Sequence, residues 1–260
     1  MSREWNSSEY HRLSQPQVSW GKKVLARLQL CGDEVVLDAG CGSGRLTADL
    51  LEALPRGRVV GVDISQNMLQ AAREHLKDCS ARVSLVAADL TGLPFFHIFD
   101  GIVSTAAFHW VLDHDSLSAN LYRALRAGGW LHAQCGGGPN LARLRERLSE
   151  LAHSAEFAPY LANFAEPWLF QNDEGMECTL RRAGFAEIET CIEAAPTVLD
   201  GRKQYIDFVR SVIVRTHIEH LPNEHLRTQY MQVLADRAAK DTPPFSLDYW
   251  RLNLSARVPD

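Results

Sequence analysis

Hydrophobic positions in the first half of the chain form short apolar runs separated by amphipathic segments. The runs predict buried strands at residues 35–38, 58–63, 82–88, 99–105 and 130–135. The segments between them carry apolar residues at helical spacing, so strands alternate with single helices. This alternation predicts a parallel sheet with right-handed crossover connections.

The second half of the chain has a more helical pattern. Residues 136–170 are mostly helical in pattern, an amphipathic helix is expected at 173–183, and residues 186–194 predict a sixth strand. Residues 200–240 are strongly helical, and residues 245–258 alternate as a seventh strand. With 260 residues, 46% of them hydrophobic, the chain can bury one large core together with a modest cap.

The first predicted strand ends in an acid followed by three closely spaced glycines, which gives Asp38, Gly40, Gly42 and Gly44. Such glycines let the backbone turn sharply and approach a ligand without Cβ clashes. Apolar residues then recur at helical spacing, so a helix begins where the loop ends. Asp63 ends the second strand about twenty residues later, where a carboxylate can accept hydrogen bonds from both hydroxyls of a ribose. The sequence therefore predicts a nucleoside-binding site.

The spacing of the glycines distinguishes between nucleoside ligands. A dinucleotide-binding loop G-x-G-x-x-G would need its third glycine at position 45, which is Arg45, so a nicotinamide oxidoreductase is disfavoured. The pattern D-x-G-x-G-x-G instead resembles motif I of the class I S-adenosylmethionine-dependent methyltransferases. This resemblance implies that S-adenosylmethionine is the cofactor, that the loop from Asp38 to Gly44 lies against its methionine part, and that Asp63 binds its ribose.

The resemblance extends to the third strand. Ala87-Ala88-Asp89-Leu90 is similar to the family segment whose acid meets the adenine amino group, which implies that role for Asp89. Further candidates for contact with the cofactor lie beside these motifs or at the end of the fourth strand; they are Cys41, Ile64, Met68, Leu90 and Thr105. Cys41 is expected to pack within the loop rather than to act as a nucleophile.

The resemblance also implies a fold and a division of the chain. The expected fold class is α/β, a Rossmann-like, doubly wound, seven-stranded and mostly parallel sheet with an antiparallel last strand and a helical cap. The expected parts are an N-terminal helical lid at residues 1–33, a methyltransferase core at 34–198, a helical cap insertion at 199–244 and the final strand of the core at 245–260. The lid and the cap are expected to determine which acceptor is methylated.

The end of the fourth strand carries the candidate chemistry. The stretch from His109 to Asp113, H-W-V-L-D, is similar to one in the trans-aconitate and juvenile hormone acid methyltransferases, in which the Trp lines the acceptor pocket. His109 and Trp110 are therefore the catalytic candidates, and the resemblance favours a carboxylic acid as the acceptor. A carboxylate is ionised at neutral pH and needs no base, whereas a hydroxyl or carbon acceptor would need a group such as His109 to take its proton.

Four further residues are candidates for acceptor binding. Tyr10 and Gln17 match in spacing a Tyr and a Gln that precede motif I in juvenile hormone acid methyltransferases. The alternative is that Tyr10 and Trp5 only pack the N-terminal arm against the domain. Arg210 and Arg215 are candidate cations for a carboxylate, with solvated surface positions as the alternative. Apolar cap residues such as Tyr205 predict that the roof of the pocket is hydrophobic, which favours a fatty or terpenoid acid as the acceptor.

Charge, hydropathy and cysteines argue against other classes of function. The formal net charge is −5 with no Lys/Arg run, which gives no electrostatic argument for a nucleic-acid partner. No apolar stretch approaches the roughly 20 residues that span a bilayer, and the N-terminus lacks an apolar signal core, so a cytoplasmic protein is expected. The cysteines form no C-x-x-C pair, and His217 and His220 have no evident third ligand, so no metal is expected.

The sequence thus predicts a methyltransferase of a small molecule, with O-methylation of a carboxylic acid by in-line transfer as the favoured reaction. Two alternatives stay open. One is C- or O-methylation of a quinone or natural-product precursor, and the other is a non-catalytic cofactor-binding protein whose cap binds a partner. The sequence defines neither the acceptor nor the oligomeric state.

Overall fold

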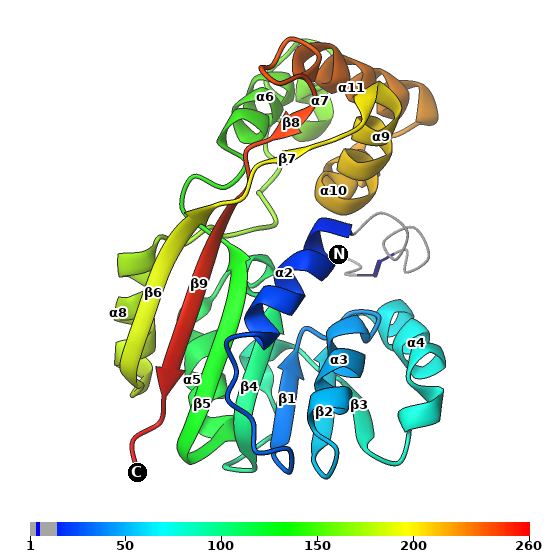
Figure 1. The fold of residues 1–260 in the computed structure, drawn as a ribbon. Coiled ribbons are helices and arrows are strands. Elements are labelled where there is room, and N and C mark those ends of the chain that lie inside the picture. The colour runs from blue at the N-terminus through cyan, green and yellow to red at the C-terminus, as the bar shows by residue number, and fades with distance from the viewer. Residues whose placement is uncertain (1–3, 6–14) are drawn as a thin grey trace.

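The computed structural model describes residues 4–5 and 15–260, with side chains in the second range described from Trp20 onward. In this part of the chain, a seven-stranded sheet lies below a group of helices (Figure 1). The sheet has the order β3-β2-β1-β4-β5-β9-β6, and β9 pairs antiparallel with both of its neighbours. Its strands are β1 (Val35–Ala39), β2 (Arg58–Asp63), β3 (Val83–Ala87), β4 (Phe99–Thr105), β5 (Leu125–Gly136), β6 (Ala186–Ala194) and β9 (Trp250–Arg257). The predicted fold class is confirmed.

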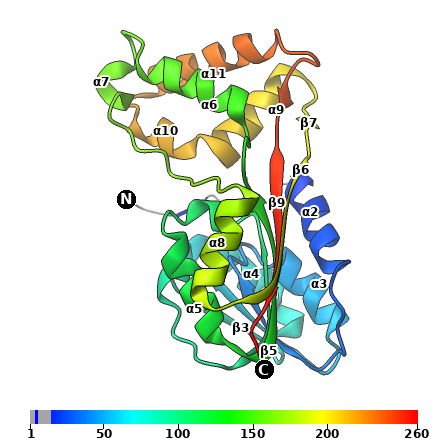
Figure 2. The same cartoon turned by 90° about the vertical axis from the view of Figure 1, so that its left-hand side faces the viewer.

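Helices cover both faces of the sheet (Figure 2). One face carries α2 (Gln15–Leu25), α3 (Arg45–Ala53) and α4 (Gln66–His75), and the other carries α5 (His114–Ala124) and α8 (Asp173–Ala183). Alternate residues of β1 are buried on opposite sides, because Val36 packs in a cluster with Leu50 of α3 and Leu37 packs in a cluster with Leu121 of α5. A strand buried on both faces has a continuous apolar run, which is why the run at 35–37 predicts a central strand.

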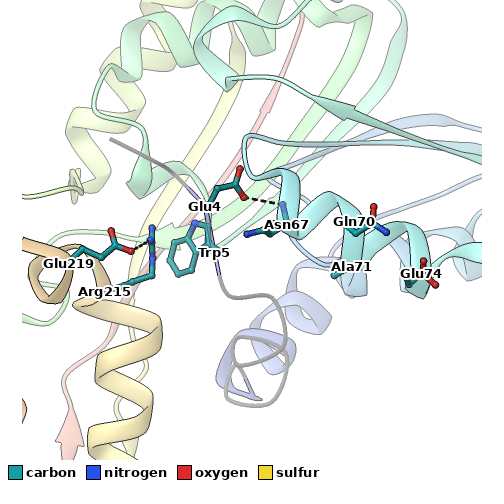
Figure 3. Close-up of a pocket in the computed structure, with 8 residues that line it drawn as sticks. All are labelled: Glu4, Trp5, Asn67, Gln70, Ala71, Glu74, Arg215 and Glu219. Carbon is teal, nitrogen blue, oxygen red and sulfur yellow. Dashed lines mark hydrogen bonds and ion pairs between the residues drawn. The ribbon is translucent and has the colours of Figure 1, made fainter. Parts of the chain in front are cut away.

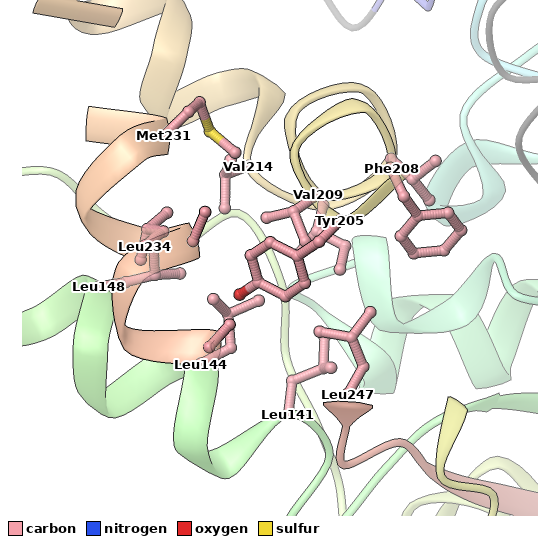
Figure 4. Packing of buried hydrophobic residues seen from close by; sticks show 14 of the residues in the cluster. Leu141, Leu144, Leu148, Tyr205, Phe208, Val209, Val214, Met231, Leu234 and Leu247 are labelled. Carbon is pink, nitrogen blue, oxygen red and sulfur yellow. The ribbon is translucent and has the colours of Figure 1, made fainter. Parts of the chain in front are cut away.

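The helices above the sheet form a second hydrophobic cluster, which we call the cap core. The elements of the cap are α6 (Ala142–Ala152), α7 (Ala158–Leu161), α9 (Gly201–Phe208), the π-helical turn η4 (Val209–Ile213), α10 (Arg215–His220), α11 (Glu224–Ala238) and the paired strands β7 (Thr197–Val198) and β8 (Ser246–Leu247). Leu144 and Leu148 of α6 pack in the same cluster as Leu234 of α11 (Figure 4). The cap therefore includes more of the chain than the predicted insertion at 199–244.

The cap core also accounts for the apolar residues that predicted a hydrophobic pocket roof. Tyr205, Phe208 and Val209 are at most 2% exposed and pack against other cap residues (Figure 4). Their burial stabilises the cap itself. These three residues therefore do not support a fatty acceptor, whereas the neighbouring cap residues Val212 and Ile213, on which the same prediction rested, do line the pockets described below.

Several predicted elements agree with the structure to the residue, and others differ at their ends. The predicted elements at 58–63, 173–183 and 186–194 are confirmed to the residue. Within the N-terminal segment expected as a helical lid at residues 1–33, the helix α2 ends at Leu25. β5 begins at Leu125 instead of residue 130, because Leu125 already pairs with Phe99 of β4.

The stretch at 245–258 forms two strands rather than one. β8 pairs with β7 in the cap, and β9 then crosses down between β5 and β6. The last segment of the chain thereby connects the cap to the sheet (Figure 1). No helix in the described part of the chain is long and apolar enough to cross a membrane.

Candidate active site

A cavity of about 490 Å³ lies between the carboxyl ends of the parallel strands and the cap. One wall consists of residues that directly follow four neighbouring strands, with Gly42 after β1, Asp63 at the end of β2, Asp89 after β3 and Thr105 at the end of β4. Parallel strands bring these positions to one edge of the sheet, as is usual for ligand sites in open α/β folds. We call this space the main cavity; the opposite wall comes from the cap and includes Ile213.

The three glycines of the loop, Gly40, Gly42 and Gly44, all have positive φ angles. Gly40 has φ +84°, and a Cβ atom there would lie 2.3 Å from the Cβ of Ala107, so the loop can pass beneath the end of β4 only as glycine. Gly42 has φ +53°, and a Cβ atom there would meet nothing within 4 Å. Gly42 also lines the main cavity, so its bare backbone leaves open space against the loop.

Asp63 connects the glycine loop to the end of β2. Its Oδ2 accepts a hydrogen bond from the amide of Gly42 at 2.9 Å, and its Oδ1 accepts one from the amide of Ser65 at 2.9 Å. Burial raises the pKa of Asp63, and these backbone donors oppose that shift. A carboxylate oxygen has more than one lone pair, so both oxygens can accept a further hydrogen bond from a ligand hydroxyl in the cavity.

Three predicted motif residues support the loop from behind and do not line the main cavity. Asp38 is 1% exposed, and its Oδ2 accepts a hydrogen bond from the Thr47 hydroxyl at 2.6 Å. Burial raises the pKa of Asp38 to about 7, the Thr47 hydrogen bond opposes this, and the charge of Asp63 adds to it. Cys41 is buried beside the loop, and Gly44 precedes α3 with φ +81°.

The remaining predicted cofactor residues line the main cavity. Asp89 accepts hydrogen bonds from the amide and hydroxyl of Thr91, at 2.9 and 2.8 Å. These contacts fix its side chain at the start of the next turn. Ile64, Met68 and Leu90 form the apolar part of the same wall.

The chain turns sharply after Thr105. Ala106 has φ +56°, a left-handed conformation that costs roughly 1–2 kcal/mol for a residue with a Cβ. Its amide donates to the carbonyl of Gln134 at 2.8 Å, which fixes the turn against β5. The following residues form the turn η3 (Phe108–Trp110), which carries both catalytic candidates. Strain of this kind is often found where a backbone is shaped for a ligand.

A second, smaller pocket of about 40 Å³ adjoins the main cavity, and we call it the side pocket. The two spaces share the residues Trp5, Ala106, Trp110 and Ile213. Beyond these, the walls of the side pocket include Trp20, His109, Asn140, Phe170 and Arg251. The structure therefore places Trp110 between the two spaces and His109 in the side pocket only.

His109 is a buried, neutral imidazole with a defined hydrogen-bond direction. Its Nδ1 lies 3.3 Å from the amide nitrogen of Gly136, so it accepts that N–H. Burial, the charge of Arg251 and then the neighbouring His114 lower its pKa well below the usual value. A neutral imidazole that accepts at Nδ1 carries its proton on Nε2. His109 is therefore arranged as a hydrogen-bond donor.

Of the two predicted cap arginines, only Arg215 lines the main cavity. Its guanidinium lies 5.1 Å from the centre of the Trp5 ring and pairs with Glu219. Arg210 forms an ion pair with Glu224 at 2.7 Å and lines neither space. Of the other substrate candidates, Tyr10 lies outside the described residues, and so does the side chain of Gln17, which belongs to α2.

The N-terminal residues Glu4 and Trp5 close one side of the site. The Glu4 carboxylate accepts hydrogen bonds from the amides of Asn67 and Gln66, at 3.0 and 3.1 Å, and from the Ser65 hydroxyl at 2.9 Å. The hydrogen bond from the Asn67 amide is the main cause of the lowered pKa of Glu4. Glu4 therefore caps α4. This contact holds the Trp5 ring edge-on against the Trp110 ring, with the ring centres 5.2 Å apart.

Trp5 also borders an outer groove of about 520 Å³ between α4 and α10 (Figure 3). The sequence indicated only an aromatic segment near the N-terminus and did not connect it to α4. Sequence reasoning also missed Arg251, although a polar residue within an apolar strand is a signal for a buried contact. Asn140 and Phe170 carried no such signal, because they lie in segments predicted only as mostly helical.

Comparison with known proteins connects this geometry to a family. Residues 36–129 match the family model described as a methyltransferase domain. The trans-aconitate 2-methyltransferase of Azoarcus sp. (strain BH72) is 37% identical over 130 residues, 50% of this chain and 50% of that protein. The protein of the same name from Rhodopseudomonas palustris (strain BisB5) is 26% identical over 254 residues, 93% of this chain and 92% of that protein. The chain spans about half the length of the relatives that it matches at 37% identity.

Solved structures share the fold. A proposed methyltransferase from Bacillus halodurans C-125 has a TM-score of 0.66 at 19% identity and covers 93% of this chain and 100% of that chain. Phosphoethanolamine N-methyltransferase 2 of Haemonchus contortus, in complex with S-adenosyl-L-methionine, has a TM-score of 0.60 at 21% identity and covers 93% of this chain and 53% of that chain. Together, the comparisons show a methyltransferase domain at residues 36–129 and a fold that the chain shares with solved methyltransferase structures.

Proposed function

We propose that this protein transfers a methyl group from S-adenosylmethionine to a small carboxylic acid. The observation that carries the proposal is the convergence of Gly42, Asp63, Asp89 and Thr105 on one wall of a single cavity of about 490 Å³. That volume lies in the range of sites that bind small molecules and cofactors. The names of the relatives, trans-aconitate 2-methyltransferases, support an acid as the acceptor.

The residues present fit the cofactor. Gly42 leaves open space where a side chain would fill the cradle, and Asp63 presents a carboxylate to ribose hydroxyls. Asp89 provides a carboxylate, and the apolar residues Ile64 and Leu90 provide an apolar wall, for the adenine ring of the cofactor. When bound, S-adenosylmethionine supplies a methyl group on a positively charged sulfur. The protein then has to align the acceptor atom with that methyl group and exclude water.

The protonation of His109 favours a carboxylate over a hydroxyl or carbon acceptor. Its Nδ1 accepts from Gly136, so the nitrogen that can face a ligand is the protonated Nε2. A donor can hold and orient a carboxylate, but it cannot take a proton from a hydroxyl. A carboxylate attacks without losing a proton, so alignment of the reacting atoms supplies most of the catalysis, with a limit of about 7–11 kcal/mol from intramolecular reactions.

The test uses methyl-labelled S-adenosylmethionine and a mixture of small carboxylic acids that includes trans-aconitate. The labelled product is treated with mild base, which releases methanol from a carboxyl methyl ester. Base-labile label is the expected result, and Asp63→Asn should lose transfer in proportion to its loss of affinity for S-adenosylhomocysteine. Label that survives base contradicts a carboxylate acceptor, and cofactor binding with no transfer to any compound contradicts catalysis.

A further inference from the structure

Arg251 is a buried cation in the wall of the side pocket. It lies in β9, between β5 and β6, and is 2% exposed. Its guanidinium carbon lies 4.1 Å from the centre of the Trp20 ring, which supports the flat face of the group. In the pairing of β5 with β9, the residue opposite Arg251 is Gly136, where a Cβ atom would lie 2.7 Å from the Phe170 ring and 2.8 Å from Asn140 Nδ2, so glycine lets these two pocket residues approach the sheet. An arginine side chain keeps its charge even when it is buried.

Two buried hydrogen-bond donors lie in the same pocket. His109 presents its Nε2–H, as its contact with Gly136 requires. Asn140 is 2% exposed, and its Oδ1 accepts from the amide of Trp250 at 2.9 Å, which leaves the Nδ2 hydrogens as its donors. A planar cation with donors at its side suits a carboxylate, which accepts hydrogen bonds through both oxygens.

The size of the side pocket limits what it can hold. A water molecule needs roughly 10–15 Å³ of such volume, so about 40 Å³ accommodates only a few heavy atoms. A carboxylate group fits this space, but a whole acceptor does not. The side pocket and the main cavity share Ala106 and Trp110 in their walls, so the remainder of the acceptor would extend past these residues towards the strand ends that carry the cofactor residues.

We propose that Arg251 binds a carboxylate of the acceptor other than the one that is methylated, so that the site selects di- or polycarboxylic acids. This inference rests on the proposed function, because it assumes methyl transfer in the main cavity. One carboxylate is held by Arg251, with His109 and Asn140 beside it, and a second carboxylate on the same molecule reaches past Trp110 to the methyl donor. Arg251 is then a substrate-binding residue that determines specificity.

The experiment compares the full-length protein with Arg251→Gln and Arg251→Lys. Arg257→Gln is the matched control, because Arg257 lies on the same strand, has a half-exposed side chain and lines neither pocket. Its guanidinium donates a hydrogen bond of 3.1 Å to the Gly128 carbonyl. The probes are acids of equal length with two or one carboxylates: succinate and butyrate, adipate and hexanoate, suberate and octanoate, together with trans-aconitate. Methyl transfer gives kcat/KM, and calorimetry on protein saturated with S-adenosylhomocysteine gives acid binding without reaction.

Wild type should prefer the diacid of at least one pair or trans-aconitate. Arg251→Gln should lower kcat/KM for that acid by about 100-fold, as expected when one partner of a buried charge pair is removed. It should change kcat/KM for the monoacids and affinity for S-adenosylhomocysteine by less than about threefold, which also shows that the variant is folded. Arg251→Lys should recover part of the diacid preference, because it keeps the charge but not the planar fork. Arg257→Gln should behave as wild type.

Three results would overturn the assignment of Arg251. They are absence of diacid binding to wild type, equal losses for diacids and monoacids in Arg251→Gln, and an unchanged diacid preference in that variant. Failure of the proposed function has a different signature. In that case wild type transfers no label to any acid, while diacids still bind and Arg251→Gln still loses their binding, which supports the inference about Arg251.

Discussion

Replacing His109 tests whether the site works without a general base. The contact between Nδ1 and the Gly136 amide makes His109 a donor, so Gln at this position keeps a donor of similar reach. Because Gln keeps a donor and changes only its position, we expect a cost of about 0.5–1.5 kcal/mol, which corresponds to roughly a two- to tenfold decrease in kcat/KM. Removal of a general base would instead cost about 100-fold or more. The two roles therefore predict different results for His109→Gln.

The pH dependence of stability provides a second measure of the same residue. The pKa of His109 is lowered in the folded protein by burial, by Arg251 and by His114. Below the unfolded value, which is about 6.5, the unfolded chain binds a proton that the folded protein does not. The stabilising contribution of neutral His109 is therefore complete above that pH and decreases as pH falls, by up to about 1.4 kcal/mol per pH unit.

The assay compares wild type and His109→Gln between pH 5.5 and 8, by urea unfolding and by kcat/KM on the best carboxylic acid. The difference in unfolding free energy between the two proteins should be flat above pH 6.5 and should change by about 1.4 kcal/mol per unit below it. Taking the difference cancels Asp38, whose raised pKa gives a slope of opposite sign. A loss of kcat/KM of about 100-fold or more in His109→Gln would refute the assignment of His109 as a donor.

Three further substitutions test other parts of the site. Gly40→Ala should lower the free energy of unfolding in urea by about 2–5 kcal/mol, because it adds left-handed strain and a clash with Ala107. The control Gly92→Ala should change the free energy of unfolding by less than about 0.5 kcal/mol. Equal effects of the two substitutions would contradict this account of the loop. Asp63→Asn should weaken S-adenosylhomocysteine binding at least tenfold by calorimetry, because it replaces a charged acceptor of two backbone N–H groups, and an unchanged Kd would remove Asp63 from the cofactor site. Trp5→Ala should raise the acceptor KM about tenfold in steady-state kinetics, because it opens the wall shared by both pockets, and an unchanged KM would contradict that closing role.

The cofactor half of the site is predictable because local chemistry defines it. Asp63 is the last residue of β2 and Gly42 lies in the loop just after β1, and the parallel pairing of β1 with β2 brings these strand ends together. The fold follows for the same reason, since the apolar runs and the segments between them already contain the strand and helix periods.

The acceptor half depends on tertiary packing and was only partly predictable. Arg251 comes from the last strand of the sheet and His109 from the turn after β4, so a long stretch of chain separates two neighbours in one pocket. The sequence indicated cap arginines because they lie in an unusual insertion, yet Arg210 forms an ion pair with Glu224. A cation inside a central strand was the better signal, because burial of a charge is costly unless the charge has a partner or a ligand.

The distribution of charge fits the proposed carboxylate acceptor. The acids Asp63 and Asp89 line the side of the main cavity assigned to a cationic methyl donor, while Arg251 lies in the side pocket assigned to an anion. Methyl transfer to a carboxylate converts a cation and an anion into two neutral products, so charge decreases along the reaction. Aromatic walls such as Trp110 and Trp168 exclude water, and in such a low-dielectric space the opposite charges attract more strongly than they do in water. A neutral hydroxyl acceptor would gain none of this attraction, and it would still need a base that His109 does not provide.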